Sequence, residues 1–585
     1  MPKSLHAWQP VGQDVVRDSL YGRLGNNGGS GRTIVAGATN SIAVHEQNNQ
    51  TILFAGTVNG GIFSRVLSEE PEKNKWSWVS NPSDGYVGSQ GIGKLAVSKN
   101  GKLIAVGQGN PSNYSAISTI SHGLLIGALG RKGSIEWPEL SADHQQQLYG
   151  HNIRSLHWLG SQAILATSFD PGRGGSIIRA SIGRDGDFDQ IDITDVSQLN
   201  LVSATQDKFS VLAGSGGESS DEYANKILLV KNAALKNLGN NESDDFSIDQ
   251  LSGQVYQSLL REYDEESATI RRVDLAHKLI NKRLVVFVGL SREDSSSSDF
   301  VYRVDRLEVH PSSGEVVGVK TFRTQKGEIG TNQASNDALY GNFSFSIDPR
   351  DDMGSGVFLG GNHFGGSPEE AGISYGGGLV YVDFRPDKPA ITHRLYGPRV
   401  QESEQGMQSL IFPINPGQPH ADSRNIAFAN DAENPVLYQV DDGGVWSLAL
   451  RKTPGSGFQS DQFWRPLSSP GLNAFEVMMT DWHAQSNGVV ASYQDNAASY
   501  AISGEAYANN LWGGDGEIAV IDDAGDKSFS RAYLSSQEYF KDGSMARLKI
   551  NSSGFLEGYD VIDFLLQDAP DSKPLLWDHT FEFWT

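Results

Sequence analysis

Short apolar segments separated by polar, glycine-rich turns recur along the whole chain. The clearest copy spans residues 425–448, where apolar segments at 426–428 and 436–440 flank a polar turn, and the tight turn 441–444 leads into a third apolar segment. Three short strands cannot bury their faces alone, so each copy is predicted to pack on its neighbours. This is the pattern of a β-propeller or another repeat array.

The repeats account for most of the chain. We predict an all-β fold, a β-propeller of about nine recognisable four-stranded blades, because the units have the length of blades with insertions. Rings of 4–8 blades are usual, so two tandem propellers are favoured over one large ring. We place N-terminal blades in residues 1–400 and C-terminal blades in residues 401–585, the latter being incomplete or closing with the N-terminal strand.

The pattern blurs over residues 235–280, which indicates an insertion between blades or a seam between rings. Within this region, residues 254–266 read either as a short helix or as a long edge strand with its turn.

Composition excludes several classes of function. With 47 Lys+Arg against 70 Asp+Glu, the net charge of −23 repels nucleic acid and anionic lipid. The absence of cysteine excludes disulfides, thiolate metal sites and cysteine nucleophiles. No segment approaches the roughly 18 apolar residues of a spanning helix, so membrane insertion is not expected.

The N-terminus lacks the apolar core of a signal peptide. Acidic, cysteine-free chains rich in Gly, Ser and Asn are nevertheless common among exported bacterial proteins. We expect an extracellular or cell-surface location reached by another route, although a cytoplasmic chain could have the same composition.

Three stretches, residues 37–65, 107–114 and 434–447, resemble the repeats of the sialidase-like, BNR-repeat and sortilin-like propeller superfamily. This superfamily includes xyloglucan-cleaving hydrolases built as two tandem propellers, with one catalytic aspartate before a Gly-Gly turn in each half. Asp441 falls on that position, whereas the corresponding residue of the first repeat is Val58. Inverting hydrolysis needs two carboxyl groups, so Val58 argues against this activity.

Other marks of the superfamily are weak. No arrangement indicates the three arginines and tyrosine nucleophile of sialidases. The Asp-box turn, Ser-x-Asp-x-Gly-x-x-Trp, has only degenerate counterparts, such as residues 132–137.

Acids and amides occupy the loops that follow the second strand of successive repeats. Such loops open on one face of a propeller, beside the channel, where ligands usually bind. The predicted ligand-binding residues are Asn59, Asn110, Asp170, Asn362, His363, Asp422, Asp495, Asn496, Trp512 and Asp515. The alternatives are that Asp, Asn and Gly simply favour tight turns, and that tryptophan packs in the core.

His420 and Asp422 precede the clearest repeat and are expected to approach its acidic turn. If the chain is an enzyme, the predicted catalytic residues are Asp441, Asp442 and His420, acting as an acid/base pair or as metal ligands. The alternative for His420 is a hydrogen bond to a buried backbone group.

We expect no cofactor, with calcium as the one alternative. Asp522, Asp523 and Asp526 resemble a fragment of a calcium loop but lack the spacing and glycine of an EF-hand.

Taken together, these features favour a non-catalytic propeller, a binding or structural module for a glycan or a protein partner. The alternative is a glycoside hydrolase or lyase that acts on a polysaccharide through acidic residues at the propeller channel.

Overall fold

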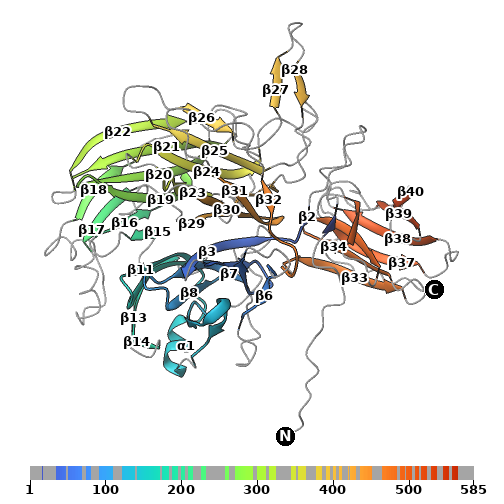
Figure 1. Ribbon diagram of the computed structural model, residues 1–585, viewed down its shortest axis with the longest axis horizontal. Helices are drawn as coiled ribbons and strands as arrows, with labels where there is room; N and C mark the ends of the chain where they lie inside the picture. Colours follow the sequence, from blue (N-terminus) through green and yellow to red (C-terminus); the bar gives the residue numbers. More distant parts are fainter. Residues whose placement is uncertain are drawn as a thin grey trace, which may run out of the picture. The chain divides into compact units, whose positions relative to one another are not determined.

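The structure of the chain is a computed structural model (Figure 1). It describes residues 16–17, 34–47, 50–68, 74–80, 91–109, 121–138, 141–170, 174–183, 187–195, 199–204, 209–214, 226–231, 257–262, 270–293, 300–310, 315–323, 344–350, 354–363, 377–384, 391–394, 399–402, 408–411, 419–420, 422–429, 435–450, 464–472, 474–483, 488–494, 496–502, 508–512, 516–522, 529–536, 544–551 and 556–563. The chain forms two compact units, one of Ala38–Leu467 and one that combines Met1–Gly37 with Ser468–Thr585.

The described residues of the unit Ala38–Leu467 form seven four-stranded antiparallel sheets, which we number in chain order. Their first strands are β3 (Thr39–Gln47), β7 (Ile92–Val97), β11 (Ile153–Leu159), β15 (Leu199–Ala204), β19 (Ile270–Ile280), β23 (Ser344–Ile347) and β29 (Asn425–Ala429). Their second strands are β4 (Gln50–Thr57), β8 (Leu103–Gln108), β12 (Ala163–Asp170), β16 (Phe209–Gly214), β20 (Arg283–Glu293), β24 (Gly356–His363) and β30 (Val436–Asp441).

The third strands are β5 (Ile62–Leu67), β9 (Leu124–Leu129), β13 (Gly174–Ile182), β17 (Lys226–Lys231), β21 (Phe300–Val309), β25 (Gly377–Asp383) and β31 (Gly444–Ala449). The fourth strands are β6 (Ser77–Trp78), β10 (Ile135–Glu136), β14 (Phe188–Asp195), β18 (Gln257–Glu262), β22 (Val316–Arg323), β26 (Ile391–Arg394) and β32 (Arg465–Pro466). Each sheet is therefore made of four strands that are consecutive among the described elements.

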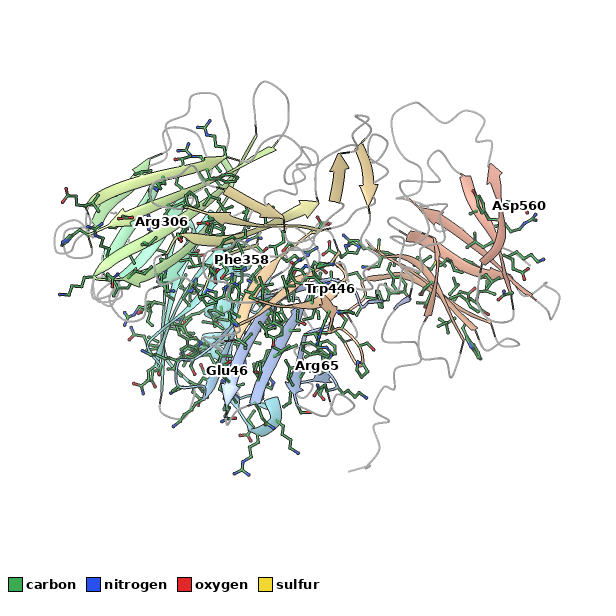
Figure 2. The ribbon with its side chains drawn as sticks, turned by 45° about the horizontal axis from the view of Figure 1, so that its top comes forward. Glu46, Arg65, Arg306, Phe358, Trp446 and Asp560 are labelled. Carbon is green, nitrogen blue, oxygen red and sulfur yellow. The ribbon has the colours of Figure 1, made fainter. Side chains whose placement is uncertain are left out.

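The seven sheets close into a ring. Each first strand packs against the first strand of the next sheet, and β29 of the seventh sheet packs against β3 of the first. Apolar side chains fill the space between neighbouring sheets: Phe358 of the sixth sheet packs with Leu437 and Trp446 of the seventh (Figure 2). This arrangement is a β-propeller, as the repeats predicted.

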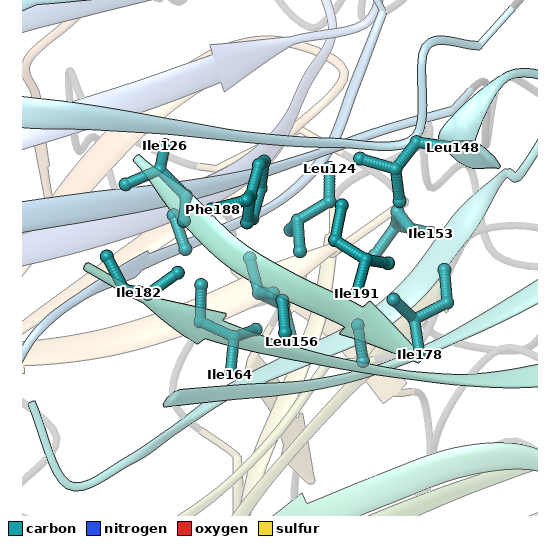
Figure 3. Packing of buried hydrophobic residues seen from close by; sticks show 13 residues of the cluster. Leu124, Ile126, Leu148, Ile153, Leu156, Ile164, Ile178, Ile182, Phe188 and Ile191 are labelled. Atoms are coloured by element: carbon teal, nitrogen blue, oxygen red, sulfur yellow. The ribbon is translucent and has the colours of Figure 1, made fainter. Parts of the chain in front are cut away.

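A short helix, which the sequence did not predict, contributes to this core. Helix α1 (Ala142–Leu148) begins after Ser141, whose hydroxyl accepts a hydrogen bond of 3.2 Å from the backbone N–H of His144. Leu148 at its end packs with Leu124 of the second sheet and Ile153 of the third (Figure 3). A 3₁₀ turn (Arg131–Gly133) precedes β10. No helix among the described residues is long and apolar enough to cross a membrane.

The described residues of the other unit form two packed sheets. One consists of β33 (Val477–His483), β34 (Gly488–Tyr493), β35 (Ala497–Ile502) and β36 (Ala508–Trp512), extended by β1 (Val16–Arg17) and β2 (Ile34–Val35). The other consists of β37 (Gly516–Asp522), β38 (Phe529–Ser536), β39 (Ser544–Asn551) and β40 (Leu556–Asp563). The N-terminal strand β1 pairs in parallel with β36, so the N-terminal segment joins this unit.

The observed division differs from the expected boundary at residue 400. The seventh sheet, which starts at Asn425, completes the first ring, and the units divide after Leu467. The residues that follow the expected boundary include a two-stranded hairpin, β27 (Arg399–Glu402) and β28 (Gln408–Ile411), which lies between the sixth and seventh sheets in the sequence.

The sequence predicted an insertion or a seam in residues 235–280. Where the structure describes this region, at residues 257–262 and 270–280, it instead contains strands of two consecutive sheets of the ring. Here β18 is the fourth strand of one sheet and β19 the first strand of the next, so the edge-strand alternative for residues 254–266 is confirmed at 257–262.

We expect Gly37→Ala to destabilise the unit that contains the N-terminal segment, by about 1–3 kcal/mol. Gly37 has a φ of 92°, and an added Cβ would lie 2.5 Å from the backbone carbonyl of Ala474. The backbone N–H of Ala474 also donates to the carbonyl of Ala36 at 3.1 Å, so the clash falls on a hydrogen-bonded pair of segments. Urea denaturation measures the change.

Gly558→Ala is the matched control for this experiment. A Cβ at Gly558 would meet nothing within 4 Å, so this variant should unfold like the wild type. Equal stability of the two variants would contradict the steric role of Gly37.

Candidate functional site

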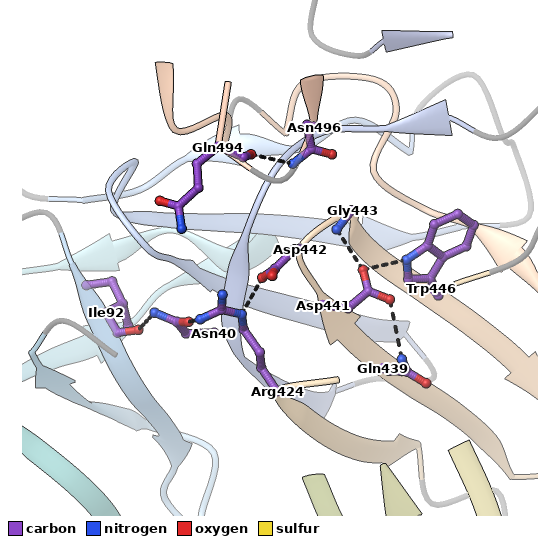
Figure 4. Close-up of polar contacts among 10 residues, drawn as sticks. All are labelled: Asn40, Ile92, Arg424, Gln439, Asp441, Asp442, Gly443, Trp446, Gln494 and Asn496. Atoms are coloured by element: carbon purple, nitrogen blue, oxygen red, sulfur yellow. Dashed lines mark hydrogen bonds and ion pairs between the residues drawn. The ribbon is translucent and has the colours of Figure 1, made fainter. Parts of the chain in front are cut away.

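The acidic turn of the seventh sheet is a closed set of hydrogen bonds. Asp441 is fully buried, and its Oδ1 accepts from the backbone N–H of Gly443 and from Nε1 of Trp446, each at 2.9 Å (Figure 4). Its Oδ2 accepts from Nε2 of Gln439 at 3.3 Å. The carboxylate therefore joins the turn to the third strand of its own sheet, which is a structural role.

The spacing of these residues was visible in the sequence and was missed. Asp441, Gly443 and Trp446 satisfy the Asp-x-Gly-x-x-Trp part of the Asp-box pattern, with Gln439 where that pattern has serine. Asp441 is the aspartate that accepts from the glycine N–H and the indole N–H at this spacing.

Asp442 begins a chain of polar contacts that crosses three sheets. It forms a buried ion pair with Nε of Arg424, which lies immediately before β29. Nη1 of Arg424 donates to Oδ1 of Asn40 at 3.0 Å, and Nδ2 of Asn40 donates to the carbonyl of Ile92 at 3.2 Å. These contacts connect the seventh, first and second sheets of the ring.

Further hydrogen bonds follow the same first strands. The side chain of Asn425 accepts from the backbone N–H of Ile42 at 3.1 Å, and the hydroxyl of Ser41 accepts from the N–H of Leu95 at 2.9 Å. The polar residues around the acidic turn therefore hold neighbouring sheets together, including the pair at which the ring closes.

Asp422 lies close enough to the acidic turn for its charge to affect Asp441, in agreement with the expected approach of Asp422 to this turn. Burial is the largest cause that raises the pKa of Asp441 well above its usual value, and the charges of Asp442 and Asp422 raise it further. Asp422 is half-buried, with a φ of 67°, and His420 is 7% exposed. No group of three or more His, Cys, Asp or Glu among the described residues could hold a metal ion.

Several predicted ligand-binding residues belong to equivalent turns of the ring. Asn59 is exposed between β4 and β5, and Asp170, Asn362 and His363 lie at the ends of β12 and β24, next to the turns into β13 and β25. Asn110 lies outside the described residues. Only for Asn59 does the structure describe the side chain.

The remaining predicted residues belong to the other unit and are not part of the seven-sheet ring. Asn496 is buried and donates from Nδ2 to the carbonyl of Gln494 at 3.2 Å (Figure 4). Trp512 is on β36, which lies between β35 and β1 in its sheet. Outside the described residues are Asp495, Asp515, Asp523 and Asp526, while Asp522 ends β37.

The expected equivalence of Asp515 to the other turns is wrong. Its position falls between β36 and β37, which is a connection between two sheets, whereas the other turns join a second strand to a third.

We expect the chain to lose about 2 kcal/mol of stability between pH 7 and pH 5 through His277 on β19. Burial, followed by the charge of His157, lowers the pKa of His277 from 6.5 to about 4. The unfolded chain therefore binds a proton before the folded chain does, so stability falls as the pH drops below 6.5. Urea titrations at both pH values measure the loss.

His277→Gln should flatten this pH dependence. Burial also lowers the pKa values of His45 and His122, which leaves a smaller slope of the same sign in the variant. An unchanged slope would show that His277 does not titrate as described.

No protein-family model and no curated protein sequence matches the chain. Among solved structures, it is similar to an ancestral GH74 enzyme, with 12% identity and a TM-score of 0.51 over 90% of this chain and 62% of that one. The RRP9 WD40 repeats (10% identity, TM-score 0.36, 71% of this chain and 95% of that one) are also similar. So is the Pan2 WD40 domain of Neurospora crassa (10% identity, TM-score 0.37, 72% and 90%).

The chain thus spans less than two thirds of the length of the GH74 enzyme. At such low identity the likeness shows the fold alone, which is a β-propeller. The narrower resemblance to sialidase-like and BNR repeats stays a prediction.

Proposed function

We propose that this chain is a non-catalytic β-propeller module that binds a glycan. The observation that carries the proposal is the state of the two candidate acids, Asp441 and Asp442, which are both 0% exposed and held by Trp446, Gly443 and Arg424. A general acid or base must reach the substrate or a water molecule. Fully buried carboxylates in a turn meet neither requirement.

The position that would supply a second carboxyl group supports the same conclusion. That position is occupied by Val58, which is fully buried, and valine has no carboxyl group to offer at the place that corresponds to Asp441. Glycoside hydrolysis needs two carboxyl groups on opposite sides of the scissile bond.

A glycan ligand is favoured over a protein ligand by the fold neighbour and by charge. The GH74 enzyme, a glycoside hydrolase by its name, has a similar fold, and we take this likeness as support for a glycan ligand. The net charge of −23 disfavours polyanionic ligands, which leaves neutral polysaccharides as the preferred class. Such a ligand agrees with the proposed extracellular or cell-surface location.

Affinity electrophoresis against a panel of neutral polysaccharides tests the proposal, with release of reducing ends measured in parallel. We expect retardation by at least one polysaccharide and no release of reducing ends. Release that Asp441→Asn abolishes would overturn the non-catalytic assignment and support the hydrolase alternative. Absence of retardation by every polysaccharide would overturn the glycan assignment.

A further inference from the structure

Trp78 presents a fixed aromatic surface on the first sheet of the ring. It lies on β6, is 46% exposed, and its Nε1 donates to the backbone carbonyl of Gly60 at 3.0 Å. The indole has one hydrogen-bond donor, and this bond uses it. The ring is therefore held in one orientation while nearly half of it stays in contact with solvent.

The turn that anchors the indole is itself rigid. The hydroxyl of Thr57 accepts from the backbone N–H of Gly60 at 2.8 Å and donates to the carbonyl of Gly61 at 3.0 Å. Gly61 has a φ of 83°, and the N–H of Val58 donates to the carbonyl of Ala38 at 3.2 Å. The turn is thus held both within itself and to the segment before it.

Asn59 is at the exposed tip of this turn, next to the residue that anchors Trp78. Its side chain is exposed, and an amide group contains both hydrogen-bond donors and an acceptor. The hydrogen-bonded turn therefore brings two exposed residues, one aromatic and one with an amide side chain, into the same part of the surface.

We propose that Trp78 and Asn59 form a binding site for a neutral pyranose unit of a polysaccharide. The apolar C–H face of the sugar stacks on the indole, and its hydroxyl groups bond to the amide of Asn59. Residues 57–61 and 77–80 include no charged residue, and this composition favours a neutral sugar. The site rests on the proposed function, because it specifies where and by what chemistry the glycan binds.

The proposal is tested with the full chain and neutral polysaccharides such as xyloglucan and mixed-linkage β-glucan, with alginate as the anionic comparison. We expect Trp78→Ala to weaken binding at least tenfold, as expected for an aromatic residue at the centre of a contact. Asn59→Ala should weaken it by a smaller factor, and alginate should not bind.

Trp482→Ala is the matched control, because Trp482 is also exposed (58%) but is in the other unit. It should bind like the wild type. Trp78→Phe keeps an aromatic face and should retain part of the affinity, which separates stacking from support of the turn.

The outcomes distinguish the site from the function. If the wild type binds no polysaccharide, the proposed function fails and the site fails with it. If the wild type binds and both Trp78→Ala and Asn59→Ala bind equally well, the site is overturned while the function stands. Tight binding of alginate would overturn the assignment to neutral sugars.

Discussion

Arg424→Met is expected to destabilise the seven-sheet unit by about 3–5 kcal/mol, because it leaves a buried carboxylate without its cationic partner. Arg424 and Asp442 expose 2% and 0% of their side chains, so solvent does little to screen the pair. The substitution also removes the hydrogen bond to Asn40 that joins the seventh sheet to the first. Urea denaturation of the wild type and the variant, followed by tryptophan fluorescence, measures the difference in unfolding free energy.

The double variant Arg424→Met with Asp442→Asn separates the two contributions. Neutralising the carboxylate removes the cost of the unpaired charge, so the double variant should recover more than half of the loss. The remaining deficit then reports the lost contact with Asn40. A double variant as unstable as the sum of the two single variants would contradict the buried ion pair.

Ring closure explains why this pair matters. Each sheet is formed by strands consecutive in sequence, so no strand exchange among the described elements ties the seventh sheet to the first. Side chains join them instead. The side chains of Arg424 and Asn425 bond to residues of the first sheet. In the opposite direction, Arg65 on β5 and Trp76, just before β6, both donate to the backbone carbonyl of Leu467, Trp76 at 2.7 Å. The closure depends on these contacts and on the apolar core.

The strands were predictable wherever apolar alternation and turn residues coincide. In residues 425–448 the expected strands agree with β29, β30 and β31, because the apolar residues alternate and the sequence 441–444 favours a tight turn. The residue at which a strand begins or ends depends on the few residues around it. For this reason the fold class could be inferred from the sequence.

The arrangement of the repeats was less accessible, because it depends on contacts between distant residues. The bond between Ile42 and Asn425 joins positions 383 apart, and nothing local in either strand marks which repeat closes the ring. The observed division comes after Leu467 because the seventh sheet closes the ring, so the boundary expected at residue 400 lies too early in the chain. Helix α1 was missed because it is only 7 residues long.

The sequence grouped the acidic residues of this turn but gave no direct sign that two of them are buried. The sequence identified Asp441, Asp442 and Asp422 as a group, and the structure places their charges close enough to affect one another. Burial could not be inferred from the turn signal alone, because polar turn residues are usually exposed. The Asp-to-Trp446 spacing was the one local sign that Asp441 faces inward.

Asp441→Ala is expected to lower the unfolding free energy by about 2–4 kcal/mol, because buried donors lose their acceptor. The N–H groups of Gly443 and Trp446 and the amide of Gln439 all point to this carboxylate. Urea denaturation measures the loss. A variant as stable as the wild type would show that the turn does not depend on the carboxylate.

Asp441→Asn separates the structural role from the charge. Its Oδ1 can still accept from Gly443 and Trp446, so the turn should be kept and the unfolding free energy at pH 7 should change by less than about 1 kcal/mol. Because burial raises the pKa of Asp441, the folded chain binds a proton more tightly than the unfolded chain. The wild type therefore gains stability from this group as the pH falls and loses it as the pH rises through the folded pKa, whereas the asparagine variant lacks that contribution. A pH dependence identical in both proteins would contradict the raised pKa, and a large loss in the asparagine variant would mean that the charge itself holds the turn.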